Sequence, residues 1–513
     1  MLFRSSRHRL LETVVNLRRW WLPSVGAWLW LLLFLGLQLS PRRAELLNDG
    51  DPCWHWLQGD WMIKHGAVLR ADTLSHTRPG AALICKDWMS DVLWAVAGNW
   101  SGWSGVIFLT AVLIATSLWL LYRQLRTEGA DALLAAALTL LAAWACSSHW
   151  LARPLLMTHV LAVLVGWTLR DFDRDRITGR QAGVRVAALM LVWANVHGGF
   201  FTGFAMIGLY VLGYAVWLVV CAPVNRRNLL RKLAVLAVLA GVAVVVSLLN
   251  PNGWRLHAHI IGFLRVPALA LSTNEWRPPD FSSATMRRFV ALLVTTAAVL
   301  MAVRPRLRPT DWVVAGGWGI LALQASRNVA IFALVVTPML AEHLTAALRA
   351  SRGNWWTRLS ARMSAFDRIA GGVGVVALSL IAVLLALAKP VLVTELPDNE
   401  WPAAAVRFLR ANDGSMRGQM FNEYVWGGYL AQQLPDRKVF IDGRNDFYGP
   451  ELVREYSEVS QLQPGWEGVL QKYGVGWTIL PRAHRLNEVL AVHPQWQVVH
   501  TDAVATVYCR RSL

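Results

Sequence analysis

The sequence is poor in charged residues. Only 16% of its 513 residues are Asp, Glu, Lys or Arg, whereas 55% are hydrophobic, 28 are Trp, and the mean hydropathy is +0.38. A soluble domain of this length would not carry so much apolar surface, so the composition excludes an ordinary soluble protein and indicates repeated membrane-spanning runs. Acids are the scarcer charge, 32 against 50 Lys and Arg, which leaves a net charge of +18.

The sequence also lacks the common short motifs of catalysis and cofactor binding. It contains no GxGxxG, GxxxxGK[ST], HExxH or GxSxG pattern, no internal repeat and no low-complexity segment. These absences exclude the dinucleotide-binding, P-loop, zinc-protease and serine-hydrolase signatures. Its five cysteines do not form a zinc-binding pattern. Cys53 and Cys85 could pair in an oxidising compartment or remain two separate free thiols.

Long apolar runs are what the sequence has instead. A bilayer core about 30 Å thick needs about 20 helical residues, so flanking residues must complete the shorter runs. No small-residue cleavage site follows the first run, so we expect no cleavable signal peptide. The runs predict about eleven transmembrane helices, at residues 24–40, 105–122, 131–148, 155–169, 185–197, 199–221, 232–249, 288–303, 311–326, 328–346 and 368–390.

The positions of Lys and Arg predict the orientation. The N-terminal segment 1–23 is basic, and every even-numbered run ends at another basic cluster. These clusters are Arg123/Arg126, Arg170/Arg174/Arg176/Arg180/Arg185, Arg226/Arg227/Arg231/Lys232, Arg304/Arg306/Arg308 and Arg349/Arg352/Arg358/Arg362/Arg368. Because basic loops stay cytoplasmic, the N-terminus is expected inside and the C-terminus outside the membrane. The same placement explains the positive charge without a nucleic-acid partner.

The expected organisation therefore has three parts. The basic segment 1–23 is cytoplasmic, residues 24–390 form the transmembrane domain with a long first outer loop at 41–104, and residues 391–513 form a periplasmic domain of a bacterial inner-membrane protein. Alternating elements in this tail favour an α/β fold. Helices are predicted at 402–412, 449–461 and 465–475, strands at 418–424, 437–444 and 476–482, and a hairpin within 495–511.

The first outer loop opens with an unusual pair of acids. In "LLNDGDPCWHW", Asp49 and Asp51 are two residues apart, so in an extended chain they face the same side and could share Mg²⁺ or Mn²⁺. The alternative is structural, because Asp is a favoured cap for a helix that begins near Pro52.

Single polar residues at the outer ends of other runs are further candidates. Arg153 and Arg327 could bind a phosphate or simply lie at the membrane interface as helix-end arginines. His197 is either a site residue or a structural histidine, and His257 follows the turn "NPNG". Glu275, in "STNEW", is the best second acid.

A polar cluster in the tail follows a predicted strand, where α/β folds carry ligand sites. It comprises Asp442, Arg444, Asp446 and Tyr448, in "FIDGRNDFYG". An internal Asp–Arg pair would hold such a turn equally well.

The arrangement of many spans, an acid after the first span and an outer tail resembles the GT-C glycosyltransferases, which take sugars from polyprenyl-phosphate carriers. "NDG" at Asn48–Gly50 is similar to the acid motif of oligosaccharyltransferases, and "WANVHGGF", "LNPNGWRLH", "NEWRPPDF" and "VWGGYL" resemble an uncharacterised bacterial branch. The second outer loop, "SSHWLARP", lacks the acidic pair of oligosaccharyltransferases, and no acid follows the tryptophan of "YVWGGYL", which puts metal dependence and peptide recognition in doubt.

The resemblance implies a membrane glycosyltransferase that moves a sugar from a polyprenyl-phosphate-linked donor to an acceptor, of unknown class, on the outer face. Asp49 and Glu275 would be catalytic, Arg327, Arg153, His197 and His257 would bind the donor phosphate, and Asp442, Arg444, Asp446 and Tyr448 would lie on the acceptor side. The alternative is a non-catalytic membrane protein for assembly or transport of envelope glycans. An ion-coupled carrier is disfavoured because the spans hold almost no charges near mid-membrane.

Overall fold

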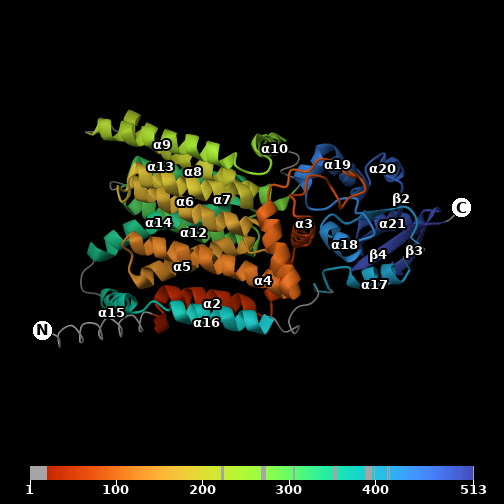
Figure 1. The fold of residues 1–513 in the computed structure, drawn as a ribbon, viewed down its shortest axis with the longest axis horizontal. Coiled ribbons are helices and arrows are strands. Elements are labelled where there is room, and N and C mark those ends of the chain that lie inside the picture. The colour runs from red at the N-terminus through yellow and green to blue at the C-terminus, as the bar shows by residue number, and fades with distance from the viewer. Residues whose placement is uncertain are drawn as a thin grey trace.

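The computed structural model consists of a helical bundle and a smaller α/β tail at one end of it (Figure 1). It describes residues 20–220, 225–266, 273–303, 307–350, 355–387 and 396–511, apart from 398, 413 and 415. The basic segment 1–19, Arg304, Arg306, Arg352 and the expected boundary between bundle and tail at 390/391 lie outside these residues.

Each of the eleven predicted runs overlaps a helix. These helices are α2 (Val25–Leu39), α4 (Trp88–Thr127), α5 (Ala132–Cys146), α6 (Leu155–Asp173), α7 (Gly179–Val196), α8 (Phe201–Val220), α9 (Arg226–Ser247), α12 (Ala284–Val303), α13 (Pro309–Gln324), α14 (Asn328–Ala350) and α16 (Val373–Leu387). Within the described residues, six helical segments are long and apolar enough to cross a membrane, and α2 and α16 contribute shorter apolar helices. The protein is therefore a multi-pass membrane protein, while the number eleven stays a prediction.

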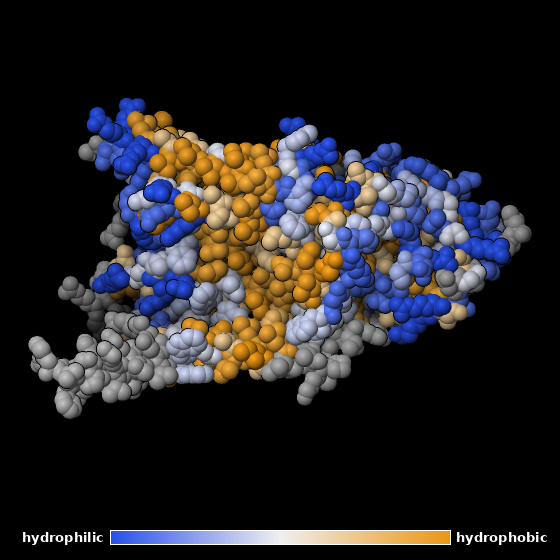
Figure 2. Space-filling view, viewed as in Figure 1, coloured by the Kyte–Doolittle hydropathy of each residue, from blue (hydrophilic) through white to orange (hydrophobic). Residues whose placement is uncertain are grey.

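The surface agrees with this assignment. On the face that Figure 2 shows, an apolar band crosses the bundle between the hydrophilic tail and the hydrophilic opposite end. α2 begins and α4 ends at that opposite end, where both meet α15 (Trp355–Ile369). The Val25 amide donates to Asp367 Oδ1 at 2.8 Å, and Arg126 Nε lies 3.7 Å from Asp367 Oδ2.

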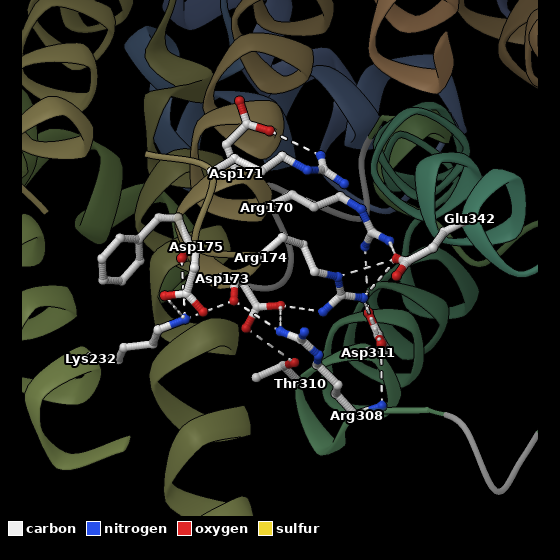
Figure 3. Close-up of polar contacts among 12 residues, drawn as sticks. Arg170, Asp171, Asp173, Arg174, Asp175, Lys232, Arg308, Thr310, Asp311 and Glu342 are labelled. Atoms are coloured by element: carbon white, nitrogen blue, oxygen red, sulfur yellow. Dashed lines mark hydrogen bonds and ion pairs between the residues drawn. The ribbon is translucent and has the colours of Figure 1, made fainter. Parts of the chain in front are cut away.

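A buried ionic cluster closes the end of the bundle away from the tail (Figure 3). Arg174, after the last turn of α6, donates from Nη2 to both carboxylate oxygens of Asp311 on α13 and to Glu342 Oε2 on α14, each at 2.9 Å. Lys232 of α9 lies 2.7 Å from Asp175. Charges of opposite sign face one another across four helices, so we interpret the cluster as a clamp that holds the helix ends together.

The first outer loop is largely ordered by helices. It contains η1 (Arg43–Leu47), α3 (Asp51–His65), an extended stretch, and the first turns of α4. Ser101 and Gly102 interrupt α4 with non-helical backbone angles, and Gly102 has φ of 57°, a conformation that favours glycine. The kink separates the part of α4 beside α3 from the part inside the bundle. Cys53 and Cys85 are both buried, separate thiols rather than a disulfide.

The tail contains a four-stranded sheet in the order β1-β2-β4-β3, with β1 parallel to β2 and the other pairs antiparallel. Its elements are α17 (Ala403–Ala411), β1 (Gln419–Asn422), α18 (Gly427–Gln433), α19 (Asn445–Ser460), α20 (Trp466–Lys472), β2 (Val475–Pro481), α21 (Arg485–Val492), β3 (Trp496–Thr501) and β4 (Ala505–Arg510). The three predicted helices and the C-terminal hairpin are confirmed, whereas α18 and α21 were not predicted.

The predicted strand at 437–444 is wrong. Val439 makes only an isolated parallel bridge, to Ser75 of the first outer loop. The Val439 amide donates to the Leu74 carbonyl at 3.0 Å, and the His76 amide donates to the Val439 carbonyl at 3.0 Å. The apolar segment "KVFI" therefore fastens the tail to the first outer loop instead of extending the sheet.

Candidate functional site

The acidic start of the first outer loop packs tightly against the tail. A Cβ on Gly50 would lie 2.1 Å from the Val425 carbonyl oxygen, and one on Gly428 would lie 2.4 Å from the Gly50 carbonyl oxygen. A Cβ on Gly443 would come within 2.0 Å of Asp51 Oδ1. The glycines of "NDGD", "VWGGYL" and "FIDGR" are thus needed for close approach, and together they fix the two acids.

A cavity of about 230 Å³ lies where the bundle, the first outer loop, α10 (Trp254–Leu264) and the tail meet. One part of its wall is apolar, with Leu155, Phe201, Ile260, Phe263 and Leu264. The polar part includes Asp51, His55, Lys86, Asp87, Arg153, His197, His259, Glu275, Arg327 and Asp446. A cavity with one apolar wall and several charged groups on the other is typical of a binding site for an amphipathic ligand.

Arg153 is the centre of the polar wall. Its Nε donates to Asp49 Oδ2 and lies 3.4 Å from Asp51 Oδ2, while its Nη1 lies 3.3 Å from Glu275 Oε2. The two loop acids and Glu275 come from distant parts of the chain. One guanidinium therefore gathers three carboxylates, and a simple interfacial arginine would not be surrounded in this way.

Glu275 connects Arg153 to a second arginine. Arg327 Nη1 lies 3.6 Å from Glu275 Oε1, and the Arg327 amide donates to the Glu275 carbonyl at 2.9 Å. The Arg327 guanidinium also stacks over Trp276, 4.2 Å from the ring centroid. Burial alone would raise the pKa of Glu275, but the charges of Arg327 and Arg153 outweigh it and lower the pKa below its usual value. This carboxylate is therefore ionised at neutral pH.

Asp49 and Asp51 lie in different environments. The Asp49 side chain is buried, pairs with Arg153 and accepts from the Asp51 amide at 3.2 Å, so it also orders the start of α3. Asp51 faces the cavity and accepts from Trp54 Nε1 at 2.9 Å. Burial raises the pKa of Asp51 to about 6, although the charge of His55 and the hydrogen bond from Trp54 act in the opposite direction.

His197 lies on the cavity wall, as expected for a site residue. Its Nδ1 accepts from the Gly199 amide at 3.1 Å and lies 2.8 Å from Thr158 Oγ1, which in turn accepts from Trp193 Nε1. A ring that accepts at Nδ1 carries its proton on Nε2. His197 can therefore offer an N–H donor to a bound anion without being charged.

His257 lies elsewhere. Its Nε2 is 2.9 Å from Ser247 Oγ, and its ring packs against Phe200 with a centroid separation of 5.2 Å. His259, two residues later, lines the cavity instead. Two residues along a helix turn by about 200°, so the two histidines face opposite sides of α10, and His259 shares its side with Ile260 and Phe263. The helical spacing of these apolar residues was the signal that would have selected His259.

Of the four candidates in the tail, Asp446 alone lines the cavity. Asp446 Oδ2 lies 2.5 Å from Lys86 Nζ and 2.8 Å from His259 Nε2. Burial would raise the pKa of Asp446, but the positive charge of Lys86 and the bond from His259 lower it. In the sequence, Lys86 could be read as an acceptor contact or as simple loop polarity, whereas nothing there pointed to His259, whose partner Asp446 lies in the distant tail.

Asp442, Arg444 and Tyr448 form a separate buried cluster. Arg444 Nε donates to Asp442 Oδ1 at 2.8 Å, and the Tyr448 hydroxyl donates to Asp442 Oδ2 at 2.8 Å. Arg444 Nη1 lies 2.8 Å from Asp72 of the first outer loop. This geometry matches the alternative of an internal Asp–Arg pair, and the pair joins the tail to the loop.

The carboxylates near the cavity do not fit a divalent metal in this arrangement. Within the described part of the chain, no group of three or more His, Cys, Asp or Glu residues is placed to hold a metal ion. Asp49 and Asp51 direct carboxylate oxygens at the Arg153 guanidinium, which occupies the position that a shared cation would need.

Comparison with solved structures identifies the fold. The oligosaccharyltransferase AglB from Archaeoglobus fulgidus, in complex with an inhibitory peptide and a dolichol-phosphate, is 16% identical with a TM-score of 0.54 over 84% of this chain and 65% of that chain. The A. fulgidus oligosaccharyltransferase tethered to an acceptor peptide gives 15% identity, a TM-score of 0.52 and the same coverage. This chain thus spans less than two thirds of the length of those enzymes.

A third structure, ArnT from Cupriavidus metallidurans bound to undecaprenyl phosphate, is 15% identical with a TM-score of 0.49, over 93% of this chain and 97% of that chain. No protein-family model matches the sequence, and comparison with curated proteins gives no match. The two oligosaccharyltransferase structures confirm the expected resemblance in fold to the GT-C glycosyltransferases.

Proposed function

We propose that this protein is a membrane glycosyltransferase that moves a sugar from a polyprenyl-phosphate-linked donor to an acceptor at the tail end of the bundle. The observation that carries the proposal is the pair of guanidiniums, Arg153 and Arg327, on opposite sides of Glu275 in a cavity with an apolar wall. The fold shared with structures that hold lipid-linked phosphates and peptides supports it.

The apolar part of the cavity wall suits the lipid chain of the donor, and the polar part suits its phosphate. The first isoprenoid units would lie against Phe201, Ile260 and Phe263, and the phosphate would lie at Arg327 and Arg153. Arginine is suited to this role because its planar donors match phosphate oxygens. The Nε2–H of His197 would add a neutral donor. Lys86, His259 and Asp446 line the side nearest the tail, where the acceptor would enter.

Transfer requires one bond to form and one to break. The acceptor oxygen attacks the anomeric carbon of the sugar, the bond from that carbon to the carrier phosphate oxygen breaks, and its electron pair stays on the phosphate. The acceptor proton passes to a carboxylate. The sequence favoured Asp49 for this role, but Asp51 is the loop acid on the cavity wall. We therefore assign proton acceptance to Asp51, and the positioning of Arg153 to Asp49 and Glu275.

Orientation follows the distribution of charge. The basic connectors would face the cytoplasm, and the cavity and tail would face the periplasm of a bacterial inner membrane. In that setting the donor reaches the cavity from the outer leaflet.

Binding of undecaprenyl phosphate tests the phosphate site, with undecaprenol as the phosphate-free control. The wild-type protein in lipid nanodiscs should bind the phosphate at least about ten-fold more tightly than the alcohol, because charge-assisted hydrogen bonds contribute about 1.5–3 kcal/mol each. Arg327→Gln should remove most of this preference. Arg255→Gln, on the exposed side of α10, should retain it. Equal binding of phosphate and alcohol to the wild type would refute the proposal.

A complementation experiment separates an enzyme from an assembly factor. A strain that lacks the protein is supplied with wild type or Asp51→Asn, and its envelope glycans are compared by mass spectrometry. An enzyme loses its product with Asp51→Asn, whereas a non-catalytic assembly factor keeps it.

A further inference from the structure

We infer that Arg153 supplies, from within the chain, the positive charge that a divalent cation would otherwise provide among the acids and the donor phosphate, so that transfer proceeds without a metal. The inference rests on the proposed function for its catalytic meaning, but its physical content, the competition between Arg153 and a metal ion, can be measured without any reaction.

The geometry around Arg153 is that of a cation site whose cation is a guanidinium. Three carboxylates contact it, those of Asp49, Asp51 at 3.4 Å and Glu275 at 3.3 Å. They approach Nε and Nη1, and Arg153 lines the cavity, where a ligand could contact the same guanidinium. Carboxylates are also the usual ligands of Mg²⁺ or Mn²⁺. The same oxygens cannot be about 2 Å from a metal ion while they hold the guanidinium.

Arg153 is held at this point by the backbone as well. The neighbouring Ala152 donates its amide to the Leu46 carbonyl at 2.8 Å, and its carbonyl accepts from Trp94 Nε1 at 2.9 Å. Two residues after Arg153, α6 begins, and the N-terminal end of its helix dipole favours a bound anion. The site is therefore built to keep a cation in place and to present it to an anion.

Arg153 and Arg327 can both contribute positive charge to the binding of one phosphate. Glu275 lies between Arg153 and Arg327, so the pair can spread over adjacent oxygens of one phosphate. A divalent ion added among the acids would meet the positive charge of Arg153 within a few ångströms. Two positive charges at that separation repel one another, and a divalent ion is repelled more strongly than a monovalent one. Arg153 and a metal therefore exclude one another.

The test measures Mn²⁺ binding to the full-length protein in nanodiscs. Electron paramagnetic resonance detects the Mn²⁺ that stays free in solution. The wild type should not reduce the free Mn²⁺ signal at equimolar metal. Arg153→Gln uncovers three carboxylates and should bind Mn²⁺ at least about ten-fold more tightly than the wild type. Arg153→Gln combined with Asp49→Asn should lose that gain. Arg70→Gln is the control and should behave as wild type. Among the described residues, the Arg70 side chain donates only to the Pro251 carbonyl.

The outcomes separate this inference from the proposed function. Stoichiometric Mn²⁺ binding by the wild type that disappears in Asp49→Asn would overturn the inference, whether or not the protein transfers sugars. If wild type and Arg153→Gln both fail to bind and the variant keeps the wild-type circular dichroism spectrum, the acids do not form a cation site, and the inference is also overturned. Sugar transfer that continues in excess EDTA supports it, and transfer that EDTA abolishes and Mn²⁺ restores refutes it.

Discussion

Arg153 and Glu275, 122 positions apart in the chain, meet with Nη1 of the arginine 3.3 Å from Oε2 of the acid. This contact connects the start of α6 to the loop before α12, and through Arg327 it reaches the turn before α14. Three connections of the bundle are thereby fixed around one carboxylate, at the wall of the cavity.

Glu275→Gln should lower the turnover number without weakening donor binding. The substitution removes the charge that positions two arginines, and a misplacement of about 1 Å can cost about 100-fold in rate. It also removes a negative charge near the phosphate, so the Kd for undecaprenyl phosphate should stay within about three-fold of wild type or improve. Rates and binding are measured on the same nanodisc preparation. Glu45→Gln, at an exposed acid of η1, is the control. A large rise in Kd with unchanged turnover would contradict the assigned role.

Asp51→Asn should impair transfer more than Asp49→Asn does. Loss of a group that accepts the proton usually costs about 10²–10⁴-fold in rate. Asp49 acts through Arg153, so its loss should cost less, about 10–100-fold, as for other groups that orient a functional side chain. Initial rates of the two variants decide the question, and a larger loss in Asp49→Asn would return the catalytic role to Asp49.

The pH dependence gives an independent check on Asp51. Its pKa is raised by burial to about 6, and it must be ionised to accept a proton. The rate should therefore fall about ten-fold per pH unit below about pH 6 and level off above it. Asp49→Asn should keep this acidic limb. A limb that disappears in Asp49→Asn but stays in Asp51→Asn would contradict the assignment.

The same shift has a consequence for stability. The pKa of Asp51 in the folded protein lies above its ordinary value of 3.8, so the folded state holds the proton more tightly than the unfolded state. The contribution of this group to stability therefore falls as the pH rises from about 4 to about 6 and is constant above that. Asp51→Asn cannot ionise, so its unfolding temperature at pH 7 should be no lower than that of wild type. Loss of activity in this variant is then not a loss of folding.

Arg174→Ala tests the ionic clamp at the opposite end of the bundle. Arg174, like Arg153, is surrounded by three acids, but it follows the last residue of α6, whereas Arg153 precedes the first. Removing one partner of a buried ionic group costs about 3–5 kcal/mol. We expect a clearly lower unfolding temperature in detergent, with the donor affinity of the remaining folded protein unchanged. Wild-type thermal stability would show that the cluster is not a clamp.

The sequence predicted the helices well because each long apolar run must satisfy its own backbone in lipid, which is a local requirement. It failed where contacts are distant. The segment at 437–444 has a strand-like pattern, yet its backbone partner is the first outer loop near Ser75. The sequence likewise identified Arg153, Glu275 and Arg327 as isolated candidates. The meeting of the two arginines at Glu275, and the position of Asp51 rather than Asp49 on the cavity wall, depend on contacts between distant parts of the chain.

Reporter fusions test the predicted orientation. An enzyme active only in the periplasm should be active when fused at the C-terminus and inactive when inserted near residue 355, where basic residues precede α15. A reporter active only in the cytoplasm should give the reverse pattern. This follows because basic connectors stay in the cytoplasm, whereas the tail lies at one end of the bundle (Figure 1). Cytoplasmic activity of the C-terminal fusion would overturn the orientation.

Gly443→Ala should damage the site from within the tail. A Cβ at this position would lie 2.0 Å from Asp51 Oδ1 and 3.2 Å from Trp54 Nε1, so either the carboxylate or the tail must shift. Gly468→Ala is a matched control in the same domain, because no atom lies within 4 Å of its added Cβ. We expect Gly443→Ala to reduce transfer by about 100-fold, a loss typical of a misplaced reacting group, and Gly468→Ala to retain wild-type activity.

Enlarging the space with Asp51→Ser in the Gly443→Ala background should restore the unfolding temperature without restoring transfer, because the clash is removed but the proton acceptor is lost. If Gly443→Ala transfers sugars at the wild-type rate, the tail does not position Asp51, and its close packing on the loop serves stability alone.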